Sequence, residues 1–405
     1  MSTQDRSAPS RPWLIALPTV ALVALGWSGF WYYASNKAEA TMAAWRAREA
    51  DAGRAYGCAT TSFGGYPFRI EVACASPSVD DRNLSVSIRA HNLAAIAQVW
   101  DPTLVIAEIA APVTVAPLDG APNAAIDWTL AQASLRGTPR APERLSVVIE
   151  KPVMSQAPGA PPVPPSSEAA PIARAEHLEF LARFLPESQP GRAVIDLKLD
   201  AKGFTAPALV TLGGPFAALA AAPADASIDA IVQGAADGAP KPLPQQLRDL
   251  AAGHGRIEIT NARLQQGDLI ATLSGPLAVT ERGTLNGEFQ LVVVNFAKLV
   301  PLLGIDRAVA QFVPQDTINR FAPTLDRFLP GLGNILRGGG GGAGAAGSAG
   351  VNSNAAANAA ALGAVALGGH ETEFEGQRAV ALTMRIDDGA VYLGPLKVGQ
   401  IPPLH

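Results

Sequence analysis

Alternating apolar and polar residues in the second half of the chain constrain the fold most strongly. The alternation runs through three consecutive segments, residues 255–264, 268–279 and 283–294. A period of two places successive side chains on opposite faces of a β-strand. The segments are separated by short breaks at residues 266–267 and 281–283, and connections this short join antiparallel neighbours. The sequence therefore predicts an antiparallel meander with one buried face and one wetter face.

The same period recurs in shorter segments along much of the chain. Further strand candidates are residues 68–72, 84–88, 103–109, 125–135, 145–150, 175–184, 193–200, 373–386 and 390–398. Short helices are expected at residues 243–252 and at residues 296–303, where Asn295 is a suitable N-cap. We therefore expect a mainly β fold, either an antiparallel curved sheet or an open barrel or sandwich, with short helices.

A charge-free segment near the N-terminus predicts a membrane anchor. No charged residue occurs from Pro12 to Asn36, and the apolar stretch at residues 13–33 has the length that a helix needs to cross hydrocarbon. Aromatic rings favour the headgroup boundary, and they occur at both ends of this stretch. They are Trp13, Trp27, Phe30, Trp31, Tyr32 and Tyr33. Arg6 and Arg11 predict a cytoplasmic N-terminus at residues 1–12 by the positive-inside rule.

A cleaved signal peptide is the alternative interpretation of this segment. Residues 38–40 read Ala-Glu-Ala and have the form of a cleavage site. The apolar stretch is longer than that of a usual signal peptide, and bulky rings crowd the approach to the site, so we favour the uncleaved anchor. Both interpretations export the remainder of the chain. We expect a single-pass inner-membrane protein whose body lies in the periplasm.

Composition divides the exported part into segments. Residues 155–171 contain six prolines among 17 residues, which predicts an extended loop. Residues 338–369 are mostly Gly, Ala, Ser and Asn, which are too small to build a core, and we expect disorder there. The remaining divisions are a membrane-proximal helix at residues 34–54, β-rich halves at residues 55–154 and 172–337, and a C-terminal β-hairpin at residues 370–405.

Two cysteines, Cys58 and Cys74, flank a pair of strand-like segments with a turn at residues 64–65 between them. Export places both cysteines in an oxidising compartment, where a disulfide persists. We therefore predict a disulfide across this hairpin. A redox role is the weaker alternative because the chain has no C-x-x-C pair.

The chain contains no residue pattern that indicates catalysis. The five histidines do not fall at metal-binding spacings, and there is no G-x-S-x-G elbow or Walker motif. Asp387 and Asp388 precede Gly389, which predicts a turn between strands rather than paired catalytic acids. A net charge of −4 argues against a nucleic-acid partner. We expect a non-enzymatic protein without metal, cofactor or nucleic acid.

Three motifs together resemble one family. They lie at residues 64–70, at residues 93–113 and in the run from residue 388 to residue 404. The motif residues are Gly64, Gly65, Tyr66, Pro67, Phe68, Arg69, Trp100, Asp101, Pro102, Asp388, Gly389, Gly394 and Pro395. This combination resembles the Gram-negative envelope family called domain of unknown function 2125, over most of the chain outside the two low-complexity segments. The family name implies no established activity.

A second resemblance lies in the succession of strand, glycine turn, strand and short helix at residues 255–303. This succession resembles AsmA-like envelope proteins. The resemblance implies an inner-membrane-anchored, β-rich periplasmic protein with a long curved sheet, an apolar concave face and a part in outer-membrane maintenance or lipid traffic. The chain is shorter than the large bridging members, so it could not cross the periplasm alone.

Alternating apolar positions on two of the predicted strands form a candidate apolar groove. These positions are Ile257, Ile259, Leu285, Phe289 and Leu291. The same residues could instead fill a closed β core, because alternation does not distinguish a face covered by protein from one covered by acyl chain. Arg69 could bind a lipid phosphate or form a surface ion pair, and we favour the ion pair. We favour a structural role for the motif that contains it.

Three functions follow from these interpretations. The first is binding of phospholipid or another envelope lipid, or support of lipid and outer-membrane homeostasis. The second is a scaffold for other envelope proteins, which would bind through sheet edges or the Pro-rich segment. The third is an envelope enzyme, which would need distant acids or histidines to converge in a cleft.

Overall fold

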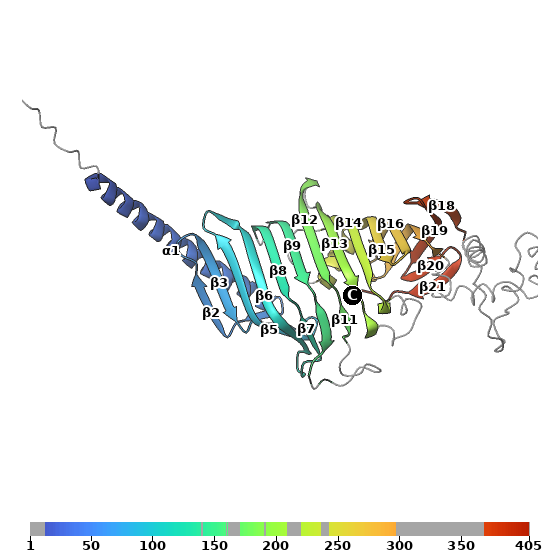
Figure 1. The fold of residues 1–405 in the computed structure, drawn as a ribbon, viewed down its shortest axis with the longest axis horizontal. Coiled ribbons are helices and arrows are strands. Elements are labelled where there is room, and N and C mark those ends of the chain that lie inside the picture. Colours follow the sequence, from blue (N-terminus) through green and yellow to red (C-terminus); the bar gives the residue numbers. More distant parts are fainter. Residues whose placement is uncertain are drawn as a thin grey trace, which may run out of the picture. The chain divides into compact units, whose positions relative to one another are not determined.

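Antiparallel strands make up most of the part of the chain that the computed structural model describes (Figure 1). The described residues are 13–138, 141–158, 160, 171–189, 192–208, 220–235, 243–296 and 368–404. The chain divides into two units, residues 1–123 and residues 124–405. The prediction of a mainly β, antiparallel fold with helices is confirmed.

Unit 1 begins with the helix α1 (Trp13–Asp51), drawn in dark blue in Figure 1. The helix is continuous through the boundary that the sequence suggested near residue 33, and Pro18 lies in its first turns, where a missing hydrogen bond is tolerated. Its C-terminus is followed by Gly53 with φ of 87°, and a glycine in this conformation commonly ends a helix. Among the described residues, no helix is both long and apolar enough to span a membrane.

The strands of unit 1 pair around one long strand. They are β1 (Arg54–Gly57), β2 (Thr60–Gly64), β3 (Arg69–Ala75), β4 (Ser78–Asp81), β5 (Val86–Gln98) and β6 (Asp101–Pro117). Strands β3 and β4 follow one another along one edge of β5, and β6 pairs with the other edge. Strand β2 pairs outside β3, and β1 pairs outside β4.

The predicted disulfide in unit 1 is confirmed. Cys58 and Cys74 are bonded, and their Cα atoms lie 5.5 Å apart. The bond joins the segment between β1 and β2 to β3, where Cys74 is buried. It therefore fixes the β2–β3 hairpin, as the positions of the two cysteines predicted.

Unit 2 contains one long run of antiparallel neighbours, seen in Figure 1 from β8 to β16. The strands of this run are β8 (Leu130–Thr138), β9 (Ala141–Glu150), β12 (His177–Gln189), β13 (Arg192–Phe204), β14 (Ala224–Ala235), β15 (Arg256–Gln266), β16 (Leu269–Val279), β17 (Leu285–Val294) and β19 (Gln377–Asp387). Each pairs with the next in this order. Among the described strands of unit 2, the order does not return from β19 to β8, so the sheet is not closed.

Smaller elements flank this run. Strand β19 also pairs with β18 (His370–Phe374) and β20 (Ala390–Leu393), and β20 pairs with β21 (Leu396–Gln400). A separate ribbon joins β7 (Ala124–Asp127), β10 (Val153–Gln156) and β11 (Ala173–Arg174). The helix α4 (Leu243–Ala252) occupies the residues at which the sequence predicts a helix.

Several predicted strand boundaries differ from the structure. Residues 125–135 form the two strands β7 and β8, and β14 was not predicted. Ser155 and Gln156 belong to β10, so the Pro-rich loop does not begin at residue 155. The turn at Glu375-Gly376 separates β18 from β19 within the predicted strand 373–386, and Gly394-Pro395 separates β20 from β21 within the predicted strand 390–398.

Some predictions fall outside the described residues. They are the cytoplasmic segment at residues 1–12, most of the Pro-rich loop, the helix at residues 296–303 after Phe296 and nearly all of the segment at residues 338–369. Asn295 itself has φ of 57°, and its side-chain amide donates a hydrogen bond to the Asp268 carbonyl at 2.7 Å. An N-cap residue normally has an extended backbone, so Asn295 does not have the expected N-cap geometry.

Candidate functional site

One face of the unit 2 sheet is apolar from strand to strand. The strand register places apolar residues directly opposite one another, so that they form rows perpendicular to the strands. The central row consists of Val147, Phe180, Leu199, Ile228, Ala262, Leu273, Leu291 and Leu382. A parallel row consists of Ile149, Leu178, Ala201, Ala226, Leu264, Ala271, Val293 and Val380. We call the surface formed by these two rows the apolar face.

The two ends of this sheet face are packed against other elements of unit 2. Leu250 and Ala251 of α4 pack with Val232, Ile257 and nearby apolar residues on the same side of the sheet. Near β19, Leu393 of β20 and two residues of β21 pack against the buried Val293 and its neighbours. These ends are ordinary hydrophobic core.

Two large apolar residues in the middle of the central row are exposed. Leu199 on β13 and Ile228 on β14 are directly opposite each other in the register, and they are 41% and 40% exposed. Phe180, the partner of Leu199 on β12, is half-buried. Exposed apolar residues that adjoin one another mark binding surfaces more often than isolated ones do. The middle of this face is therefore the candidate site.

The dimensions of the central row suit an acyl chain. Neighbouring strands lie about 4.8 Å apart, so the row from β9 to β16 is about 24 Å long. The hydrocarbon of one bilayer leaflet is about 15 Å thick, which is half of the usual core. A lipid tail of ordinary length would thus fit along the row.

The opposite face of the same strands is mostly polar. Asp196, Lys198 and Asp200 alternate along β13 with the apolar residues of the rows. Lys198 lies opposite Asp229 of β14, and the two side chains form an ion pair at 4.0 Å. The sheet is therefore amphipathic in the region where its apolar face is exposed.

The predicted groove residues lie on the apolar side of the sheet but mostly at its packed ends. Ile257 and Leu285 pack with α4, Leu291 packs toward the cluster at β19, and Phe289 is only 2% exposed. Ile259 lies opposite Ala230 and is half-buried. The predicted residues thus lie on the apolar side of β15 and β17, whereas the exposed residues Leu199 and Ile228 lie on the earlier strands β13 and β14.

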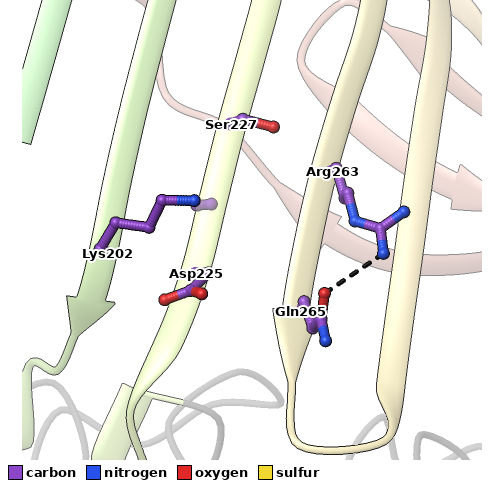
Figure 2. Close-up of a pocket in the computed structure, with 6 residues that line it drawn as sticks. Lys202, Asp225, Ser227, Arg263 and Gln265 are labelled. Atoms are coloured by element: carbon purple, nitrogen blue, oxygen red, sulfur yellow. Dashed lines mark hydrogen bonds between the residues drawn. The ribbon is translucent and has the colours of Figure 1, made fainter.

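A shallow pocket of about 70 Å³ lies on the polar face. Figure 2 shows the side chains that line it, among them Lys202, Asp225 and Arg263. Lys202 forms an ion pair with Asp200 at 3.5 Å, and Arg263 forms one with Glu375 at 2.6 Å. The Asp225 carboxylate accepts a hydrogen bond from the Gly203 amide at 2.8 Å. Because these charges have partners within the protein, the pocket is a weaker candidate than the apolar face.

The ion pair beside this pocket has a predictable pH dependence. The hydrogen bond from Arg263 lowers the pKa of the Glu375 carboxyl. A carboxyl group whose pKa is lower in the folded than in the unfolded state stabilises the protein at pH values above its unfolded-state pKa. This contribution disappears as the pH falls through the folded-state pKa. We therefore expect Glu375→Gln to reduce stability slightly near neutral pH and to have no effect in acid. Urea unfolding at a series of pH values measures this, with Glu373→Gln on β18 as the control.

The motif at residues 64–70 forms the turn between β2 and β3. Gly65 has φ of 93°, and a Cβ there would lie 2.7 Å from the Arg69 carbonyl oxygen, so the turn requires glycine. Tyr66 and Pro67 are joined by a cis peptide bond. Arg69 forms an exposed ion pair with Glu71 at 3.3 Å, which is the surface role that we favoured.

The second motif lies beside the first in unit 1. The Val99 amide donates to the Phe68 carbonyl at 3.2 Å, and the rings of Phe68 and Trp100 are 6.3 Å apart. Asp101 and Pro102 begin β6, and the Asp101 carboxylate accepts a hydrogen bond from Thr103 at 2.6 Å. The two motifs thus share one aromatic contact, which their separation in sequence does not reveal.

The third motif forms two turns between the C-terminal strands of unit 2. Asp388 and Gly389 join β19 to β20 with φ of 49° and 80°, as the sequence predicts. The Asp388 carboxylate accepts the Thr284 hydroxyl at 2.6 Å and pairs with Arg282 at 3.0 Å. Gly394, with φ of 57°, and Pro395 form the next turn. These contacts attach the last strands to the β16–β17 turn.

No group of three or more His, Cys, Asp or Glu side chains could hold a metal ion in the part of the chain that the structure describes.

The chain was compared with models of known protein families. The model of a family described as "Uncharacterized protein conserved in bacteria (DUF2125)" matches residues 31–402, which confirms the first resemblance. No curated protein matches the chain.

Proposed function

We propose that this chain, which belongs to the DUF2125 family, is a non-enzymatic, membrane-anchored envelope protein that binds lipid acyl chains on the apolar face of its sheet. The observation that supports the proposal is the exposed pair Leu199–Ile228 at the centre of an apolar row. An acyl chain on this row would remove those side chains from water, which is favourable by about 25 cal/mol for each Å² of apolar surface. The AsmA-like pattern of the sequence agrees with this function.

We further propose that the apolar part of α1 holds the chain in the inner membrane, with the sheet in the periplasm. The absence of charge from Pro12 to Asn36 supports membrane insertion. Five large apolar side chains in this part of the helix are exposed in the structure, and they are Leu17, Val20, Leu22, Val23 and Leu25. A disulfide between Cys58 and Cys74 suits an oxidising compartment. Carbonate extraction of membranes that contain the full chain tests the anchor. Release of the chain into the soluble fraction, as for a peripheral protein, would contradict it.

Photo-cross-linking in living Gram-negative cells tests lipid binding with the full chain. The photoreactive residue p-benzoylphenylalanine would replace Leu199 or Ile228 on the apolar face. We expect lipid adducts at both positions, because a bound acyl chain would lie against these side chains. Mass spectrometry of the purified, delipidated chain measures the adducts.

The controls are Lys198 and Asp229, which adjoin the two test positions on the opposite face of the same strands. The Lys198 side chain is 53% exposed, so burial would not explain a smaller yield there. Lipid adducts that are several-fold more frequent at Leu199 and Ile228 would support the proposal. Equal yields on the two faces, or no lipid at either, would exclude it. A single reproducible protein adduct would instead favour the scaffold function.

A further inference from the structure

A second exposed apolar surface lies within unit 1, where three segments meet. It contains aromatic side chains from α1, from the turn between β2 and β3 and from the turn between β5 and β6. We call it the aromatic collar, and its members are Trp27, Phe30, Trp31, Tyr66, Phe68 and Trp100. The three helical members are spaced three and four residues apart, so they share one side of α1.

Hydrogen bonds hold the collar together. The indole of Trp27 donates to the Pro67 carbonyl at 2.8 Å, and the indole of Trp31 donates to the Arg69 carbonyl at 2.8 Å. The ring of Trp31 also meets that of Tyr66 edge-on, with centroids 5.5 Å apart. The turn is therefore fixed against one short stretch of the helix.

Three of the six collar side chains remain more than half exposed in spite of these bonds. Tyr66 is 57% exposed, and Phe68 and Trp100 are each 60% exposed. Large rings at a protein surface with polar atoms at their edges are typical of the membrane–water interface. None of the collar side chains carries a charge. Nearby carboxylates have partners within the protein, because Glu71 pairs with Arg69 and Asp101 accepts a hydrogen bond from Thr103.

The position of the collar on α1 indicates its occupant. Leu25 is one of the exposed apolar residues that precede the collar, and Trp27 follows it after one glycine. We propose that the aromatic collar lies in the headgroup layer of the bilayer, so that the turn at residues 65–68 and Trp100 contact lipid together with the helix. This inference rests on the proposed membrane anchor. It places the start of β3 at the membrane surface.

The other end of unit 1 provides an internal control. Leu84 is also an exposed apolar residue, at 53%. Its neighbour Asn83 donates a hydrogen bond to the carbonyl of Ala52, which directly follows the C-terminal end of α1. Residue 52 is 25 residues beyond Trp27, which corresponds to about 37 Å along a helix. Leu84 should therefore lie in water when the collar lies in the headgroups.

Spin-label accessibility in phosphatidylcholine vesicles tests this placement with the full chain. The sequence contains two cysteines, and they are bonded to each other, so an introduced cysteine is the single free thiol. Nitroxide labels would be attached to Phe68→Cys, Trp100→Cys and the control Leu84→Cys. We expect the ratio of oxygen to nickel-chelate accessibility to be several-fold higher at positions 68 and 100 than at position 84.

Equal ratios at the three positions, in chains that float with the vesicles, would overturn the collar placement and leave the anchor in place. Chains that do not float would overturn both. Lipid cross-linking on the apolar face of unit 2 tests lipid binding separately.

If the labelled variants do not fold, Trp100→Phe provides a second test. Brominated phosphatidylcholine should quench part of the tryptophan fluorescence of the unlabelled chain. The Trp100→Phe substitution should reduce the fraction of the fluorescence that is quenched. An unchanged quenched fraction would contradict the proposal.

Discussion

Replacing Phe289 with alanine should lower the free energy of unfolding by about 3–5 kcal/mol, the usual cost of deleting a buried phenyl ring. Phe289 is 2% exposed, and its ring covers Gly287, where an added Cβ would lie 2.7 Å from the ring. Its deletion would leave a cavity that the adjacent strands β16 and β19 cannot easily close. Chemical denaturation with urea, followed by circular dichroism, measures the change.

Leu199→Ala is the matched control for this prediction. Leu199 lies on the same side of the sheet but is 41% exposed, so its truncation should cost less than about 1 kcal/mol. Similar losses at Phe289 and Leu199 would mean that the middle of the apolar face is covered in the folded protein. That result would also count against the proposed lipid site. A large loss at Phe289 alone would show that the packed end of this face contributes more to stability than its exposed centre does.

Removing the disulfide is the second change with a large expected effect. The bond between Cys58 and Cys74 closes a loop with a sequence separation of 16. On the chain-entropy model, opening a loop of this length lowers stability by about 3 kcal/mol. The double variant Cys58→Ser/Cys74→Ser should therefore unfold at a lower temperature than the oxidised chain. Differential scanning calorimetry of both proteins measures this difference.

Reductant provides the control for the disulfide prediction. Dithiothreitol should lower the unfolding temperature of the native chain to near that of the double variant and should leave the variant unchanged. If the native chain lost no stability on reduction, packing alone would fix the β2–β3 hairpin. Since this hairpin carries the turn at residues 65–68, the double variant should also loosen the aromatic collar.

Local patterns were sufficient to predict the class of fold and several of its elements. Period-two alternation at residues 255–294 predicted β15, β16 and β17, and α4 lies at its predicted residues. Strand β14 was missed, although Ala226, Ile228, Ala230 and Val232 alternate with polar residues in most of it. The small size of alanine weakens that pattern. A systematic search for alternation that counts alanine as apolar would have found the strand.

The candidate site depended on information that local patterns do not contain. Leu199 lies in the predicted strand 193–200, but its partner Ile228 lies on β14, which was not predicted. Their exposure follows from where α4 and the C-terminal strands pack, at the two ends of the sheet. The aromatic collar has the same origin, because Phe68, Trp100 and Trp27 meet only after two turns and a helix are assembled.

Residue types and their local spacing were enough to predict the antiparallel β fold, the disulfide, the family and the apolar face of β15 and β17. These properties depend on residue type and on spacing between near neighbours, which a sequence states directly. Which part of the apolar face is covered and which part meets solvent follows from the packing of the folded chain. That division depends on contacts between residues far apart in the chain, such as Leu250 with Val279 and Val293 with Leu393. Burial is a property of the assembled surface, whereas alternation is a property of a single strand.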